Sequence, residues 1–260
     1  MPVPVTVLVS PEAVGEHVAA VVYQRMAEAF AAGRGFLLGS PTGRSPRPVY
    51  AALARRLAAQ PIDLSRLTLV MMDEYLVPGP RGLAYAPAEA RWSCHHFVGT
   101  EIVPVLDAAV PAPYRVRPDA VWFPDPGDPA AYDDRIASAG GVDLFMLASG
   151  ASDGHVAFNP PGSARDSRTR IISLSEETRR DNLLTFPAFG TLDAVPHHGI
   201  SVGIDTLLRS RELVMVAWGA GKRTTVARMR AARTHEPDWP ATLVHAGGAG
   251  SIVVDEAAAG

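Results

Sequence analysis

The chain has 260 residues, 47% of them hydrophobic, which is enough for one large α/β domain with a sizeable core. Its formal net charge is −3, and its 24 Lys and Arg residues are scattered without a basic run that would hold a polyanion, so we expect no nucleic-acid partner. The single cysteine, Cys94, excludes an intramolecular disulfide and a cysteine-based zinc site.

The first residues, "MPVPVTVLVS", lack the cationic start and small-residue cleavage site of a signal peptide. No apolar run in the sequence approaches the roughly 18 residues that span a bilayer. We therefore expect a cytoplasmic protein with no membrane partner, and we assign residues 1–260 to a single domain.

A strand, a helix and a second strand are predicted within the first 40 residues. The run "VTVLV" (5–9) is short and β-branched, and Ser10, Pro11 and Glu12 then provide a helix cap, a first-turn proline and a first-turn acid. Apolar residues recur at helical spacing after this start: Val14, Val18, Val21, Val22, Met26 and Phe30. Gly33 ends the helix before the strand-like "GFLLGS" (35–40).

Further buried strands are predicted from continuous apolar runs, most of them separated by stretches with helical periodicity. The runs are "LTLVMM" (67–72), "VDLFML" (142–147), "GISVGI" (199–204), "ELVMVAW" (212–218) and "SIVVD" (251–255). This alternation predicts an α/β fold with a doubly wound, mostly parallel sheet and helices on both faces, of the Rossmann-like kind. Ligands bind such sheets beyond the carboxyl ends of the strands, so the chemistry is expected in the loops that follow strands.

Three of these loops have unusual residues: "GSPTGRSP" (39–46), "DEYLVPGPRG" (73–82) and "SGASDGHVAFNPPG" (149–162). The small residues of the first would expose backbone N–H groups at a helix N-terminus and so seat an anion, although an ordinary strand-to-helix turn has the same local features. In the second, Asp73 and Glu74 point to opposite sides of the chain, so one acid can face a site while the other faces out. A helix cap or a surface acid is the alternative interpretation.

The third loop contains the sequence "SDGH". Gly154 allows a tight turn that brings the Asp153 carboxylate near the His155 ring, where it would fix the tautomer and orientation of the imidazole. Such a histidine can act as an acid or a base. The alternative is a structural histidine whose ring is satisfied by a neighbouring turn.

The remaining histidines and the cysteine do not indicate a metal site. The pairs His95-His96 and His197-His198 consist of adjacent residues, which do not share a face, and no histidine at helical i, i+4 spacing completes a site. Cys94 lies in "RWSCHHFV", which is typical of an amphipathic helix in which a lone cysteine is a small buried hydrophobe. We therefore assign neither a metal nor a cofactor.

Six segments together resemble the glucosamine-6-phosphate deaminase/isomerase family, which shares its fold with 6-phosphogluconolactonases. They are "LLGSPTGRSPRPVYAAL", "MMDEY", "SCHHF", "DLFMLASGASDGHVAFNPPGSARDSRTRIISLSEETR", "VPHHGISVGIDTLL" and "VMVAWGAGK". The similarity runs from about residue 35 to the C-terminal "VVDEAA", and the block "DGHVAFN..PGS..DSRTR" is specific for the deaminase branch.

The resemblance implies an aldose–ketose isomerisation of an amino sugar followed by loss of ammonia. It implies that Asp73, the acid of the "MDEY" motif, is the base that moves a proton between C2 and C1. It also implies that His155 assists ring opening with Asp153 beside it. Both residue types suit these steps, because a C–H next to a carbonyl needs a base held off water and a hemiacetal needs a group that titrates near neutrality.

The resemblance further implies that the substrate's phosphate is held by the loop containing Thr42, Gly43, Arg44 and Ser45 and by Lys222 of "GAGK". We accordingly expect a small-molecule sugar partner that is phosphorylated. Homo-oligomerisation is left open by the sequence.

The chain departs from the family pattern at three positions. Pro160 stands where the family has a glutamate after the Asn, Arg44 replaces a glycine of the "TGGT" loop, and Leu184 stands where the family has a phosphate-binding arginine. Pro160 cannot titrate, which favours a substrate that opens easily or arrives acyclic.

Three function classes follow from these matches and departures. The first is a sugar isomerase or deaminase that uses Asp73 on an altered substrate. The second is a lactone hydrolase in which His155 activates water. The third is a non-catalytic sugar-binding homologue, against which the presence of Asp73, Asp153 and His155 together argues.

Overall fold

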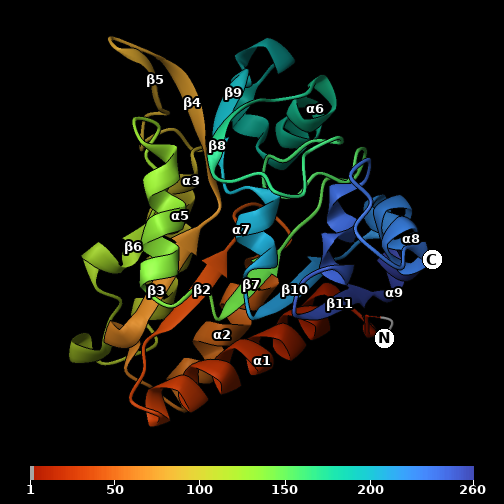
Figure 1. Ribbon diagram of the computed structural model, residues 1–260. Helices are drawn as coiled ribbons and strands as arrows, with labels where there is room; N and C mark the ends of the chain where they lie inside the picture. The colour runs from red at the N-terminus through yellow and green to blue at the C-terminus, as the bar shows by residue number, and fades with distance from the viewer. Residues whose placement is uncertain (1–2) are drawn as a thin grey trace.

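A seven-stranded parallel sheet forms the centre of the computed structural model, which describes residues 3–260 (Figure 1). The strand order is β1-β11-β10-β7-β2-β3-β6, and each neighbouring pair is parallel. The strands are β1 Val5–Leu8, β2 Phe36–Ser40, β3 Leu67–Met71, β6 Val121–Trp122, β7 Leu144–Leu147, β10 Glu212–Ala217 and β11 Ala249–Asp255. The predicted fold class is therefore confirmed.

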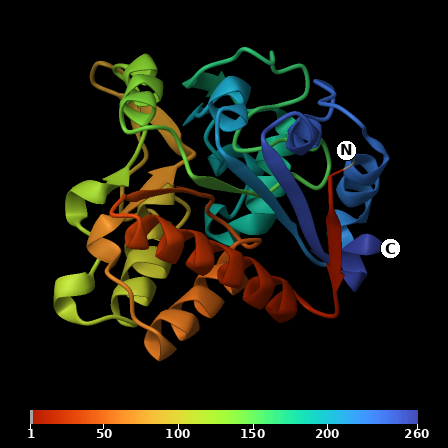
Figure 2. The ribbon, with the colours of Figure 1, turned by 60° about the horizontal axis from the view of Figure 1, so that its bottom comes forward.

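Helices cover both faces of this sheet. Successive strand residues point to opposite sides, and the apolar residues on each side are buried against the helices of that face. Leu38 and Met146 pack with α1 (Pro11–Ala31), α2 (Arg47–Ala59) and α4 (Val103–Asp107), the side that faces the viewer in Figure 2. The neighbouring residues Leu37, Phe145 and Leu147 pack on the opposite face. The helices there are α5 (Pro129–Ser138), α7 (Ile204–Leu208) and α8 (Arg223–Ala231), with α9 (Glu256–Ala259) beside them. Burial on both faces explains why these strands are continuous apolar runs in the sequence.

The predicted start of the first helix is confirmed. The Ser10 side chain accepts a hydrogen bond from the backbone N–H of Ala13 at 3.2 Å, and Pro11 occupies the first helical position. The cap satisfies one of the backbone donors that every helix start leaves without an intrahelical partner.

A second, four-stranded antiparallel sheet stands beyond the carboxyl end of the parallel one (Figure 1). Its order is β5-β4-β9-β8, with β4 Asp73–Gly79, β5 Gly82–Tyr85, β8 Arg170–Ser173 and β9 His198–Ser201. Two further helices, α3 (Cys94–Phe97) and α6 (Glu176–Thr185), lie on this side of the molecule.

Two expectations are wrong at this sheet. Residues 199–204 were expected in the parallel sheet, but β9 pairs antiparallel with β4 and β8. Residues 73–82 were expected to form a loop, but they form most of the β4–β5 hairpin. A short apolar run does not specify its pairing partner, and the Pro and Gly residues of an edge hairpin resemble those of a loop.

No helix within residues 3–260 is both long and apolar enough to cross a membrane.

The centre of the parallel sheet requires a glycine at position 39. A Cβ on Gly39 would lie 2.1 Å from the ring of Phe145, its partner on the adjacent strand β7. We expect Gly39→Ala to lower the free energy of unfolding by roughly 1–3 kcal/mol, because the ring must move within a packed core. Urea unfolding monitored by circular dichroism measures this.

Gly99→Ala is the matched control, since no heavy atom lies within 4 Å of the added Cβ and the position is helical. Alanine there should be neutral or slightly stabilising. Equal unfolding midpoints for the two variants would contradict the packing argument.

Candidate active site

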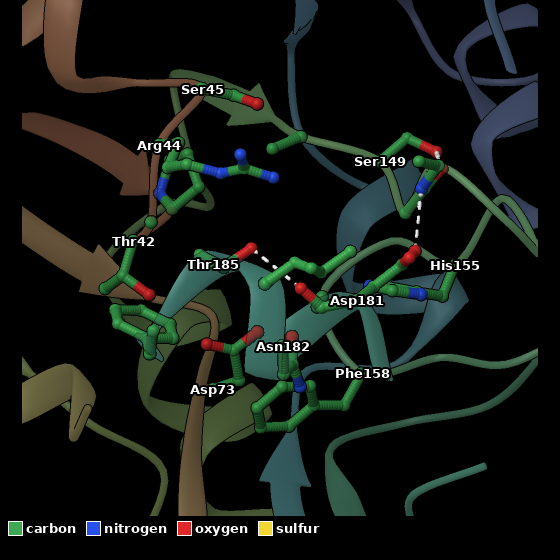
Figure 3. A pocket seen from close by; sticks show the side chains of 18 of the residues that line it. Thr42, Arg44, Ser45, Asp73, Ser149, His155, Phe158, Asp181, Asn182 and Thr185 are labelled. Atoms are coloured by element: carbon green, nitrogen blue, oxygen red, sulfur yellow. Dashed lines mark hydrogen bonds between the residues drawn. The ribbon is translucent and has the colours of Figure 1, made fainter. Parts of the chain in front are cut away.

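A pocket of about 460 Å³ opens where four strands of the parallel sheet end. Its walls come from the segments that follow β2 (41–45), β3 (72–73), β7 (148–151) and β10 (218–222), together with α6 and the first residue of α3. The carboxyl ends of parallel strands meet at one edge, which is why these distant segments converge. The candidate site residues expected in the loops, apart from Asp153, therefore line a single cavity (Figure 3).

Asp73 is the first residue of β4 and lines this pocket. Burial raises the pKa of its carboxyl from 3.8 to about 7; Glu74 contributes to the rise, while a hydrogen bond from Cys94 and the charge of His155 oppose it. The Cys94 Sγ lies 3.4 Å from Asp73 Oδ1. A carboxylate with this pKa can take up a proton near neutral pH.

Glu74 points away from the pocket, but into protein and not into solvent as expected. Its carboxylate accepts hydrogen bonds from the backbone N–H groups of Tyr75, Cys94 and His95 at 2.7, 3.0 and 2.8 Å. The Ser93 hydroxyl at 3.2 Å and the ring Nδ1 of His95 at 2.6 Å complete its contacts. The alternative interpretation as a helix cap is thus the right one, because Glu74 holds the N-terminus of α3.

Asp153 and His155 form the predicted pair. His155 Nδ1 lies 2.6 Å from Asp153 Oδ1, and the Thr178 hydroxyl donates to Asp153 Oδ2 at 3.0 Å. Burial alone would raise the pKa of Asp153, but the hydrogen bonds and charge of His155, with Thr178, outweigh it and lower the pKa to about 2. An ionised carboxylate on Nδ1 leaves the other ring nitrogen, Nε2, for the pocket that His155 lines.

Two glycines make room for this pair. Gly154 adopts a φ of +68°, which allows the tight turn expected from the sequence. A Cβ on Gly150 would lie 2.2 Å from His155 Nδ1 and 2.7 Å from Asp153 Oδ1.

The expected anion loop is part of the same pocket. Thr42, Gly43, Arg44 and Ser45 all line it, and the side chain of Arg44 extends from the loop into the cavity (Figure 3). Gly43 has a φ of +89°, which turns the chain between β2 and α2.

Lys222 reaches the pocket from the segment after β10, where its Nζ donates to the backbone oxygen of Ser149 at 2.5 Å. Burial lowers the pKa of Lys222 to about 8; Asp181 and Asp153 oppose this change, and Arg44 adds to it. Lys222 therefore loses its proton at a lower pH than an exposed lysine does.

Helix α6 contributes a further wall, of which the resemblance to the family indicated only Leu184. Asp181, Asn182, Leu184 and Thr185 line the pocket, whereas Pro160 is not among the lining residues. Leu184 is exposed and brings no charge. No local signal marks Asp181, Asn182 or Thr185, because only the packing of α6 against the 149–162 loop brings them to the site.

Asp181 connects this wall to the loop. Its Oδ2 accepts hydrogen bonds from the N–H groups of Ala151 and Ser152 at 2.8 and 3.2 Å and from the Ser152 hydroxyl at 3.0 Å. Potential ligand atoms of Asp153, His155 and Asp181 lie within 4.8 Å of one another. Asp153 and His155 hydrogen-bond to each other, and Asp181 Oδ2 accepts hydrogen bonds from the loop. Because these atoms already have hydrogen-bond partners within the protein, their closeness does not by itself indicate a cation site.

Comparison with known proteins places these features in context. Residues 9–254 match the family model described as glucosamine-6-phosphate isomerases/6-phosphogluconolactonase. A glucosamine-6-phosphate deaminase of Streptomyces avermitilis is 39% identical over 226 residues, 86% of this chain and 80% of that protein. One from Rhodococcus opacus is 34% identical over 251 residues, 96% of this chain and 89% of that protein.

Solved structures share the fold. A monomeric glucosamine-6-phosphate deaminase superposes with a TM-score of 0.82 at 24% identity, covering 98% of both chains. A 6-phosphogluconolactonase from Trypanosoma cruzi superposes with a TM-score of 0.68 at 17% identity, covering 100% of this chain and 96% of that one.

The Gly150 contacts predict a local structural effect. Gly150→Ala should displace the His155 ring and lengthen the short Nδ1–Asp153 contact, because the added methyl group would overlap both side chains. A proton in such a charge-assisted hydrogen bond resonates far downfield in the NMR spectrum, and we expect the variant to lose that resonance.

Gly221→Ala is the control, since Gly221 also lines the pocket but its added Cβ would meet no atom within 4 Å. It should retain the downfield resonance. A resonance unchanged in Gly150→Ala would show that the loop accommodates a side chain there.

Proposed function

The chain belongs to the glucosamine-6-phosphate isomerase/6-phosphogluconolactonase family, and we propose that it isomerises an amino-sugar phosphate from aldose to ketose with loss of ammonia. The observation that carries this proposal is the pairing, in one pocket, of a buried carboxyl of raised pKa with an oriented histidine. The two groups come from different elements and can act on different atoms of one bound sugar.

Ring opening is the step assigned to His155. With Asp153 accepting the Nδ1 hydrogen, the neutral ring presents Nε2 as a base to the anomeric hydroxyl. Nε2 takes that proton and gives it to the ring oxygen as the bond between C1 and the ring oxygen breaks. C1 thereby becomes a carbonyl carbon. Asp153, ionised because of its low pKa, stabilises the imidazolium formed between these transfers.

The proton transfer between carbons is assigned to Asp73. Its carboxylate removes the C2 hydrogen, and the electron pair forms a C1–C2 double bond. The carbonyl oxygen becomes a hydroxyl by taking a proton from the substrate's own C2 ammonium group. Asp73 then returns the proton to C1, which leaves an imine at C2 that water converts to a ketone with release of ammonia. Burial makes Asp73 a stronger base than an exposed aspartate, as this transfer requires.

The anion seat supports a phosphorylated substrate. Lys222 and loop 42–45 line the pocket together, and Arg44 lies close enough to Lys222 to contribute to its lowered pKa. A neutral sugar would need neither of these two cations. Arg44 lies where it can supply the positive charge that Leu184 lacks. Asp181 on the α6 wall offers acceptors that suit the sugar's hydroxyl or ammonium groups and not its phosphate.

The lactonase alternative differs in its need for Asp73. A hydrolase of that type uses a histidine to activate water and requires no base at a carbon–hydrogen bond. Solvent exchange at C2 therefore distinguishes the two activities.

Asp73→Asn retains the shape of the side chain but removes its basicity. We expect the exchange of the C2 hydrogen of glucosamine 6-phosphate with solvent deuterium to fall by at least ~10²-fold. In the unmodified protein the exchange rate should rise with pH through about 7, because only the ionised carboxyl accepts a proton. NMR spectroscopy of the substrate in deuterated buffer follows both quantities.

Asp193→Asn, a change at an exposed aspartate, is the control and should leave exchange unaltered. Exchange that persists in Asp73→Asn would remove Asp73 as the base. Ring opening of a lactone without C2 exchange in the unmodified protein would favour the hydrolase.

The contribution of the phosphate is measurable with a matched pair of ligands. We expect glucosamine 6-phosphate to bind more tightly than glucosamine, and Arg44→Ala to reduce this advantage about tenfold, through loss of a charged partner that is exposed in the unliganded protein. Leu184→Arg should increase the advantage, because it adds a cation to the α6 wall of the pocket. Titration calorimetry of the unmodified protein and the two variants compares the pair.

Arg209→Ala serves as the reference, since this exposed arginine pairs with Asp205 in α7 and does not line the pocket. If the phosphate gives no advantage in the unmodified protein, the substrate is not a sugar phosphate.

A further inference from the structure

Cys94 is a pocket residue that the reaction above does not use. Its thiol lies between the proposed base and the anion loop, with Sγ 3.4 Å from Asp73 Oδ1 and 3.4 Å from Thr42 Oγ1. We propose that Cys94 is a positioning residue whose thiol holds one oxygen of the Asp73 carboxylate and directs the other to the substrate. This inference rests on the proposed role of Asp73 as the base.

The direction of the hydrogen bonds follows from the chemistry of the three groups. An ionised carboxylate can only accept, so the contact to Asp73 requires Cys94 to donate its S–H. Burial, together with the negative charges of Glu74 and Asp73, raises the pKa of the Cys94 thiol well above its usual value and keeps it protonated. The sulfur then accepts from the Thr42 hydroxyl, which completes a chain from the anion loop to the base.

The thiol cannot easily turn away from the base. The backbone N–H of Cys94 donates to Glu74 Oε1 at 3.0 Å, while its side chain reaches Asp73 Oδ1. The two adjacent acids of β4 therefore hold the same residue, one through its backbone and the other through its side chain. Cys94 is only 1% exposed, and the Ser93 hydroxyl caps the short helix that it begins.

A thiol suits this position better than a hydroxyl would. S–H is a weak donor, so it orients the carboxylate while stabilising the charged form only modestly. A hydroxyl in its place would stabilise the carboxylate more and make it a weaker base. The charges that act on Asp73 come from Glu74 on its own strand and His155 on the facing loop, and the other charged side chains around the pocket are Arg44, Asp181 and Lys222.

Two substitutions test the proposal in opposite directions. Cys94→Ser provides a stronger donor and should lower the pKa of Asp73 by roughly 0.5–1 unit, whereas Cys94→Ala removes the donor and should raise it. NMR titration of the protein labelled with ¹³C at the aspartate carboxyls, with the Asp73 signal identified through Asp73→Asn, measures these values without any substrate.

The pH profile of C2 exchange is the second measurement. Its midpoint should move down in Cys94→Ser and up in Cys94→Ala. At the high-pH plateau, exchange should fall about tenfold in Cys94→Ala and recover largely in Cys94→Ser, with KM little changed, because an unrestrained carboxylate is misaligned but the sugar still binds.

The serine variant alone is decisive if the alanine variant does not fold. An Asp73 pKa that is unchanged or raised in folded Cys94→Ser overturns the proposal. Absence of C2 exchange in the unmodified protein would instead refute the proposed function, and the carboxyl titration would still decide whether Cys94 holds Asp73.

Discussion

The architecture of the site depends on the hydrogen bonds that the buried carboxylate of Glu74 accepts. A fully buried carboxylate is costly unless its oxygens are satisfied, and within residues 3–260 no lysine or arginine pairs with Glu74. Backbone N–H groups at the start of α3 satisfy it instead. The chain must therefore return from the β4–β5 hairpin to place α3 against β4, and this return brings Cys94 to the wall of the pocket.

The same pair of adjacent acids shows how environment separates chemical roles. Glu74 has many donors and serves the structure, while Asp73 has one side-chain donor and a carboxyl with a pKa near 7. Asp153 is also largely buried, but its contacts with His155 and Thr178 lower its pKa to about 2. With pKa values so far apart, Asp73 in the pocket wall can act as a proton acceptor, while Asp153, which contacts His155 but does not line the pocket, acts as a permanent charge.

The departures from the family pattern become intelligible through helix α6. Pro160 does not line the pocket, but Asp181 of α6 brings a carboxylate within 4.8 Å of the Asp153–His155 pair. Leu184 gives the α6 wall no cation where the resemblance implies an arginine, while Arg44 extends into the cavity from the 42–45 loop. The cations that line the cavity therefore lie on the segments that follow β2 and β10, and the α6 wall carries the carboxylate of Asp181.

The sequence by itself determined the parallel sheet, the cap of α1 at Ser10 and the loops that hold His155 and Lys222. These features depend on local rules: apolar runs for buried strands, capping residues for helix starts, and a glycine that permits the turn between Asp153 and His155. Only the tertiary structure decided which sheet β9 joins, that Glu74 faces protein, and that Cys94 and Asp181 reach the pocket. Those outcomes depend on contacts between residues far apart in the chain, such as Asp181 with Ala151, which leave no periodicity or motif in either segment.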